Sequence, residues 1–197
     1  MILIEGSDYF YDLLVQNAKK FPNETDIRKV LVSDGQDTAG RFCHWGGTAF
    51  FQADPTGSAQ RKTERLADIV DESTCLIKTD TDGFDYQILM DSLECLARFS
   101  PAVIFENQVR SERDLATANE LFSELMRVGY SCYMVWDDAG FHLVSTESIQ
   151  ILQDLNRYLF KVFQRDGHKS IYNYDVLAMH ERDRDIYEKM CNWYKSY

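Results

Sequence analysis

The chain has 197 residues, 45% of them hydrophobic, which is enough to build the core of one folded domain. Its formal charge of −11 and its pI near 4.8 argue against nucleic acid as a partner, because such binding needs clustered Lys and Arg, and also against anionic membranes. The sequence has no apolar run that could span a bilayer and no basic-then-apolar leader, so we expect a cytoplasmic protein. The five cysteines are never closely paired, which fits reduced thiols and gives no zinc pattern.

A short strand and a helix are predicted first. Residues 2–4 are apolar and lead into Glu5, and Ser7 is a typical N-cap for a helix that reaches about residue 21. An acid at the end of such a strand commonly accepts hydrogen bonds from the ribose hydroxyls of a bound nucleoside. The alternative for Glu5 is a solvated acid with no ligand.

A second strand and a polar region follow. Residues 27–33 predict a strand that turns at Ser33 and Asp34, where a plain turn residue is at least as good an interpretation as a ligand-binding one. Residues 37–63 are rich in Gly, Ser, Thr and Gln, which indicates irregular strands or a hairpin at the surface. Within this region His44 stands beside a tryptophan and two glycines, a combination that suits stacking on a sugar but equally a tight turn.

Residues 75–89, CLIKTDTDGFDYQIL, combine a short apolar strand, an acidic turn and the start of a helix. This is the layout of a ligand site at the carboxyl edge of a parallel α/β sheet. Asp82 and Asp85 also suit the positive end of the helix dipole, so capping is an alternative for them. Capping does not explain Lys78 and Asp80, which lie inside or at the end of the strand.

The remaining segments complete an α/β pattern. Residues 102–105 predict a strand that brings Glu106 to the same sheet edge, and a helix follows it. Residues 130–136 and 141–144 flank a turn and predict an antiparallel hairpin. The aromatic tail within residues 146–197 suits packing onto the domain or a dimer contact.

The run IKTDTDGFD at residues 77–85, followed by Ile88 and Leu89, resembles the signature of the FkbM family of S-adenosylmethionine-dependent methyltransferases. Four further segments resemble this family in order: residues 3–6 its second strand, 31–34 the end of its third, 64–70 the segment before its fourth, and 103–106 its fifth. The family's first strand and glycine-rich loop should precede Glu5, whereas this sequence begins at Met1, within the second strand.

The resemblance implies a Rossmann-like class I methyltransferase fold, an α/β fold with a mostly parallel sheet and an antiparallel last hairpin, truncated at the N-terminus. We expect a single domain over residues 1–197, with the core sheet and helices in 1–145 and a C-terminal helical extension in 146–197. Without the first strand, residues 2–4 and 76–77 would leave an open gap in the sheet. We expect them to pair directly, to take up another strand of the chain, or to find an edge on a second copy in a homodimer.

The implied function is transfer of a methyl group from S-adenosylmethionine, without a metal, to a hydroxyl of a sugar or polyketide-like small molecule. Asp80 would position the methionine end of the donor or the acceptor, and the other catalytic candidates would bind the acceptor or handle its proton. The candidate catalytic residues are Asp80, Lys78, Glu106 and His44, and the candidate donor-binding residues are Glu5, Ser33, Asp34 and Asp80.

Two functions from other classes remain open. Asp80-Thr81-Asp82 is also the D-x-D pattern with which many glycosyltransferases hold a divalent metal on a nucleotide-sugar diphosphate. A metal requirement would favour this alternative. The other is a non-catalytic interaction module, because loss of the glycine-rich loop would remove the backbone donors that cradle the methionine end of the methyl donor.

Overall fold

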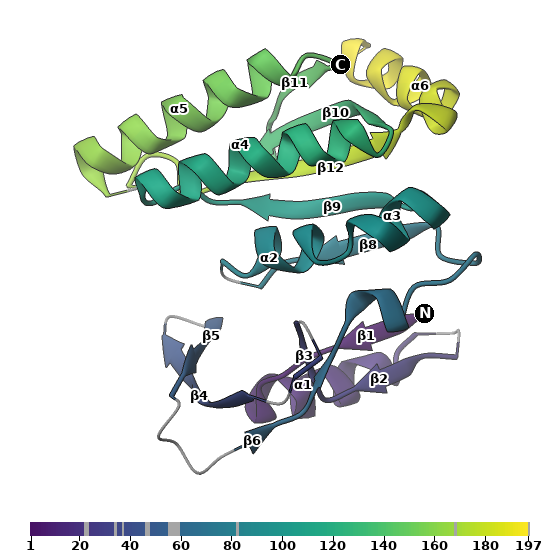
Figure 1. Ribbon diagram of the computed structural model, residues 1–197, viewed down its shortest axis with the longest axis vertical. Coiled ribbons are helices and arrows are strands. Elements are labelled where there is room, and N and C mark those ends of the chain that lie inside the picture. The colour runs from purple at the N-terminus through teal and green to yellow at the C-terminus, as the bar shows by residue number, and fades with distance from the viewer. Residues whose placement is uncertain are drawn as a thin grey trace. The chain divides into compact units, whose positions relative to one another are not determined.

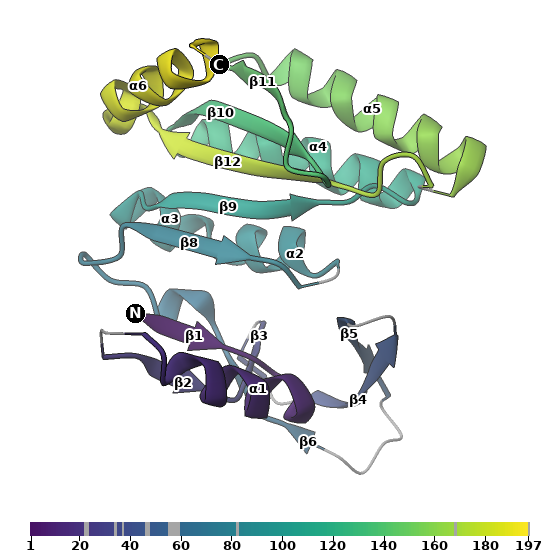
Figure 2. The same cartoon turned by 180° about the vertical axis from the view of Figure 1, so that it is seen from behind.

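A computed structural model describes residues 1–21, 24–33, 35–36, 38–45, 48–54, 60–81, 83–167 and 169–196. The chain forms two compact units, Met1–Ile69 and Val70–Tyr197. Both units combine strands with helices, as the ribbon shows from two sides (Figures 1 and 2), so the α/β prediction is confirmed. The expected division between core and extension, at residue 145, falls inside the second unit.

The described residues of the first unit form one α-helix and several short strand pairs. Helix α1 (Asp8–Ala18) begins, as predicted, after Ser7, whose Oγ accepts the Phe10 N–H at 3.5 Å. The predicted strand over residues 27–33 is interrupted, and its parts pair in parallel with different strands. These pairs are β1 (Ile2–Ile4) with β2 (Asp26–Arg28) and β3 (Leu31–Val32) with β7 (Thr63–Glu64). The predicted hairpin is present as β4 (Thr38–Trp45) and β5 (Thr48–Ala53), with β6 (Gln60–Arg61) on the other side of β4 and a 3-10 turn, Leu66–Asp68, at the end of the unit.

The second unit is built on a five-stranded sheet with the strand order β11-β10-β12-β9-β8. Its strands are β8 (Leu76–Thr79), β9 (Ala102–Asn107), β10 (Tyr130–Asp137), β11 (His142–Thr146) and β12 (Tyr174–His180). Only β8 and β9 run parallel, and the other three pairs are antiparallel. The prediction of a mostly parallel sheet is therefore wrong, whereas the hairpin of β10 and β11 is present.

Strand β12 lies where a helical extension was expected. It pairs with β9 on one side and with β10 on the other, so it separates the hairpin from the parallel pair. Its residues from Val176 to Met179 are all buried. A strand buried on both faces reads as one continuous apolar run, and periodicity cannot distinguish such a run from a buried helical segment.

Helices cover both faces of this sheet. Tyr133 on β10 faces α4, where its ring meets Phe122 at 5.7 Å between centroids. The neighbouring Cys132 faces the other way and packs with Tyr187 of α6. The helices are α2 (Asp85–Met90), α3 (Leu93–Phe99), α4 (Glu112–Arg127), α5 (Ile149–Asp166) and α6 (Arg184–Lys195), the last preceded by a 3-10 turn, Glu181–Asp183. None of the helices in the described ranges is both long and apolar enough to cross a bilayer.

The strand pairings test part of the expectation about the gap in the sheet beside residues 2–4 and 76–77. Among the described residues β1 pairs with β2, and β8 has β9 as its sheet neighbour. Among the described residues, residues 2–4 do not pair with residues 76–77, and β9 is the strand hydrogen-bonded to β8. Pairing with a second copy stays a prediction.

Gly129 joins α4 to β10 in a conformation that other residues rarely adopt, with φ at +98°. A Cβ atom at this position would collide with the imidazole of His180. We expect Gly129→Ala to lower the free energy of unfolding by more than about 2 kcal/mol, because a steric clash adds to the backbone strain. Gly140→Ala, at φ +83° with no atom within 4 Å, is the matched control and should cost only about 1 kcal/mol. Urea denaturation measures the free energy of unfolding of both variants. Equal losses would contradict the contribution assigned to the clash with His180.

Candidate functional site

The residues predicted from the sequence are divided between the two units. The first unit holds Glu5, Ser33 and His44, and the second holds Lys78, Asp80 and Glu106. Asp34 and Asp82 lie outside the described residues.

In the first unit, Glu5 and His44 both contact the start of α1. Glu5 Oε1 accepts the Ser7 N–H at 2.7 Å, and Ser7 Oγ lies 3.0 Å from His44 Nε2. The His44 ring also meets Tyr9 edge-on, at 5.9 Å between centroids. Ser33 follows β3, and its N–H donates to a backbone carbonyl of β7 at 3.0 Å. Since Ser7 is fully buried, these contacts tie β4 to the N-terminus of α1.

In the second unit, acidic residues on two neighbouring strands and directly after a third form a row. Glu106 on β9 is paired with Asp175 on β12. Thr79 on β8 is paired with Phe105, the residue before Glu106, and Asp80 directly follows Thr79. Asp80, Glu106 and Asp175 therefore follow one another across the sheet, at the edge where the parallel strands β8 and β9 end. We call these three residues the carboxylate row.

Lys78 lies on the same side of β8 as Asp80. Lys78 Nζ donates to Asp80 Oδ2 at 2.6 Å, as two residues on one face of a strand can. The two side chains are 53% and 60% exposed, so their ion pair contributes at most about 1 kcal/mol to stability. The Asp80 carboxylate is thus accessible to a ligand.

Asp175 lies in a region of excess negative charge. Burial raises the pKa of Asp175, the Lys78 ammonium lowers it, and the carboxylates of Asp80, Asp138 and Asp85 raise it. Like charges directly opposite each other on paired strands destabilise a sheet. A cation or a shared proton at the carboxylate row would relieve this repulsion.

Two residues that are close in sequence to members of the carboxylate row have buried polar atoms without hydrogen-bond partners among the described residues. Asp85 is 1% exposed, and its Oδ2 accepts the Thr81 N–H and hydroxyl at 3.3 and 2.9 Å. Asp85 Oδ1 has no hydrogen-bond partner among the described residues, and the same holds for both amide atoms of Gln108, directly after β9. In folded proteins, buried polar atoms of this kind usually bind another protein group, a ligand or an ordered water.

A chain of buried side chains holds the end of β9 on the opposite face from Glu106. The Tyr86 hydroxyl donates to Asn107 Oδ1 at 2.9 Å, and Asn107 Nδ2 donates to Asn156 Oδ1 at 2.8 Å. Asn156 Nδ2 in turn donates to Asn119 Oδ1 at 2.9 Å. This network connects α2, β9, α5 and α4, so the strand end that carries Glu106 is tied to three helices.

Asp80 and Glu106 are predicted from the sequence, but Asp175 and Gln108 are not. Asp175 is not predicted because β12, the strand on which it lies, is not predicted either. The available signal was an acid near the start of an otherwise apolar run, Tyr174-Asp175-Val176. Gln108 offers no local signal, since a glutamine after a strand is ordinarily a solvated residue.

The described residues contain no group of three or more His, Cys, Asp or Glu side chains that could hold a metal ion, so the three carboxylates of the row do not converge on one ion. Asp82, the second acid of the D-x-D pattern, is not among those residues.

No family model, no curated protein and no solved structure matches this chain. The resemblance of residues 77–85 to the FkbM signature therefore stays an expectation, and the function rests on the geometry and charge of the site.

Proposed function

We propose that the chain is an O-methyltransferase that moves a methyl group from S-adenosylmethionine to a hydroxyl of a sugar or polyketide-like small molecule. The observation that carries the proposal is the carboxylate row at the ends of β8 and β9. Ligands of α/β sheets bind outside the carboxyl ends of parallel strands. The methyl donor is a sulfonium cation, so negative charge at this edge suits it.

The residues at this edge fit such a donor. The carboxylates that raise the pKa of Asp175 create a negative potential, which a sulfonium or ammonium group would offset. Asp80 would bind the methionine end of the donor through its ammonium group. Lys78, which now pairs with Asp80, would donate to the donor's carboxylate.

S-adenosylmethionine supplies an electrophilic methyl group: the acceptor oxygen forms the new C–O bond while the C–S bond breaks and its electron pair stays on sulfur. The protein then has two tasks. The binding residues hold the two reactants at attack distance, which removes much of the entropic barrier. A carboxylate of the row takes the proton that the hydroxyl loses.

Isothermal titration calorimetry tests this proposal directly. We expect S-adenosylmethionine to bind wild type and Asp80→Asn to weaken that binding about tenfold, because a charge-assisted hydrogen bond is lost. Binding of 5′-methylthioadenosine, which lacks the methionine end, should not change in this variant. Asp154→Asn is the matched control, since Asp154 is an exposed acid paired with Arg157 on α5. No heat and no thermal shift with S-adenosylmethionine or S-adenosylhomocysteine at millimolar concentration would rule out the proposed function.

A further inference from the structure

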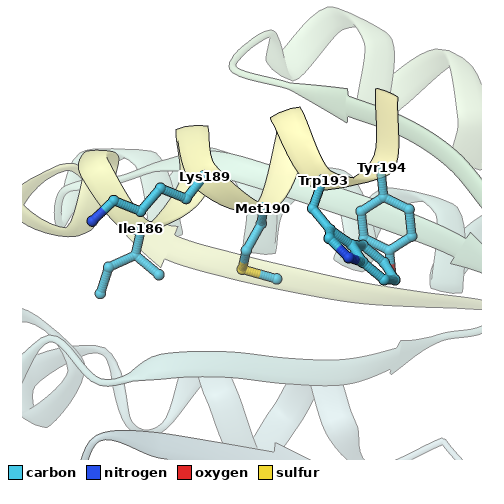
Figure 3. A pocket seen from close by; sticks show the side chains of 5 residues that line it. All are labelled: Ile186, Lys189, Met190, Trp193 and Tyr194. Atoms are coloured by element: carbon cyan, nitrogen blue, oxygen red, sulfur yellow. The ribbon is translucent and has the colours of Figure 1, made fainter. Parts of the chain in front are cut away.

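Helix α6 borders a cavity of about 310 Å³. Its lining residues are Ile186, Lys189, Met190, Trp193 and Tyr194. Figure 3 shows that the Lys189 amine points away from the end of the helix that carries Trp193 and Tyr194. Ile186 and Trp193 are 52% and 55% exposed, although both are large apolar side chains. This cavity is open to solvent, and its aromatic lining offers a face on which a small ring can stack.

Tyr194 connects this cavity to the carboxylate row. Its hydroxyl accepts a hydrogen bond from Trp136 Nε1 at 3.0 Å, and its ring stacks on His142 at 4.6 Å between centroids. Trp136 on β10 is paired with Asp175 on β12, and opposing residues of paired strands share a face. The cavity wall and the row therefore lie on the same face of the sheet, joined through Tyr194, Trp136 and Asp175.

This arrangement places an apolar wall beside hydrogen-bond acceptors. The rings of Trp193 and Tyr194 can contact the flat face of a ligand, and carboxylates accept hydrogen bonds from its hydroxyls. Asp175 is the row residue on the strand next to Trp136, so it is the carboxylate on the side of the wall. Burial raises its pKa, which makes it a stronger proton acceptor than an ordinary aspartate.

We infer that α6 forms the wall of the acceptor site and that Asp175 takes the proton of the reacting hydroxyl. The acceptor is then a small uncharged molecule whose hydroxyl is attached to an apolar or ring-shaped body. An anionic acceptor is disfavoured because it would meet the carboxylate of Asp175, which lies on the side of the wall. In the reaction the acceptor O–H bond breaks and its proton goes to the Asp175 carboxylate. The role of Asp175 rests on the proposed function, whereas binding of the ring to α6 does not need the methyl donor.

Ligand-observed NMR on the full chain tests the wall with 2-phenylethanol and phenyl phosphate. These probes share a ring, but one is a neutral alcohol and the other an anion. We expect 2-phenylethanol to bind at millimolar concentration and phenyl phosphate at least about tenfold more weakly. Trp193→Ala should weaken binding of the alcohol about tenfold. Ile151→Ala, which removes a 40%-exposed hydrophobe of α5, should leave it unchanged. Equal binding to wild type and Trp193→Ala, or equal binding of the two probes, would overturn the inference.

Asp175→Asn separates proton transfer from binding. It should retain 2-phenylethanol binding, bind phenyl phosphate more tightly than wild type, and lose methyl transfer. Its fold should be as stable as wild type at pH 7 or more so, because an acid with a raised folded-state pKa destabilises the protein once it ionises. Unchanged methyl transfer in Asp175→Asn would overturn its role. If 2-phenylethanol binds through Trp193 but S-adenosylmethionine does not bind, the proposed function fails while the ring site stands.

Discussion

We expect Asp80→Ala to reduce the proposed methyl transfer by at least about 100-fold, because misplacing a reactant at the point of attack lowers rates by about that factor. The fold should survive. Asp80 is 60% exposed, and its surface ion pair with Lys78 contributes at most about 1 kcal/mol. The measurement is methyl transfer from S-adenosylmethionine to the ring alcohols that bind wild type, alongside thermal melting of the same samples.

Two comparisons make this result specific. Asp154→Ala removes an equally exposed acid from α5, together with its ion pair to Arg157, and should change neither transfer nor melting. If Asp80→Ala unfolds the protein, Asp80 is structural and its assignment to the site is wrong. Transfer at the wild-type rate in a folded Asp80→Ala variant would contradict the assignment as well.

The second large effect is expected on stability, from Asn156→Leu. This change leaves Asn107 Nδ2 without its acceptor and removes the donor to Asn119 Oδ1. Asn107 and Asn156 are each 1% exposed, so water cannot readily replace the lost partner of Asn107. We expect a loss of about 3 kcal/mol in the free energy of unfolding, since each unsatisfied buried polar group costs about 1–3 kcal/mol. Urea denaturation measures this loss in the free energy of unfolding.

The double variant Asn107→Leu/Asn156→Leu is the control for this interpretation. Replacing both partners removes the unsatisfied donor, so the two losses should not add, and the difference gives the coupling energy. Asn119→Ala should cost less than Asn156→Leu, because Asn119 is half-buried and water can reach its partner more easily. Full additivity, or an Asn156→Leu variant as stable as wild type, would show that the network does not hold the end of β9.

Local features of this protein are determined by the sequence itself. Ser7 and Ser111 begin α1 and α4, because an N-cap acts on backbone groups two or three residues away. Strand β8 and helix α2 form as predicted, because the apolar run of the strand and the helical spacing are each set by residues close together in the chain. The Lys78–Asp80 ion pair is also a local feature, since residues two apart in an extended chain share a face.

Only the tertiary structure decides the order of the strands in the second unit. That order in turn determines which residues of the site lie next to one another. Insertion of β12 between β9 and β10 makes most of the sheet antiparallel and brings Asp175 opposite Glu106. It also sets Trp136 beside Asp175, which links the row to α6. Strand order and register depend on hydrogen bonds between segments far apart in the chain. The apolar run of β12 is buried on both faces, so it carries no alternation from which its neighbours could be inferred.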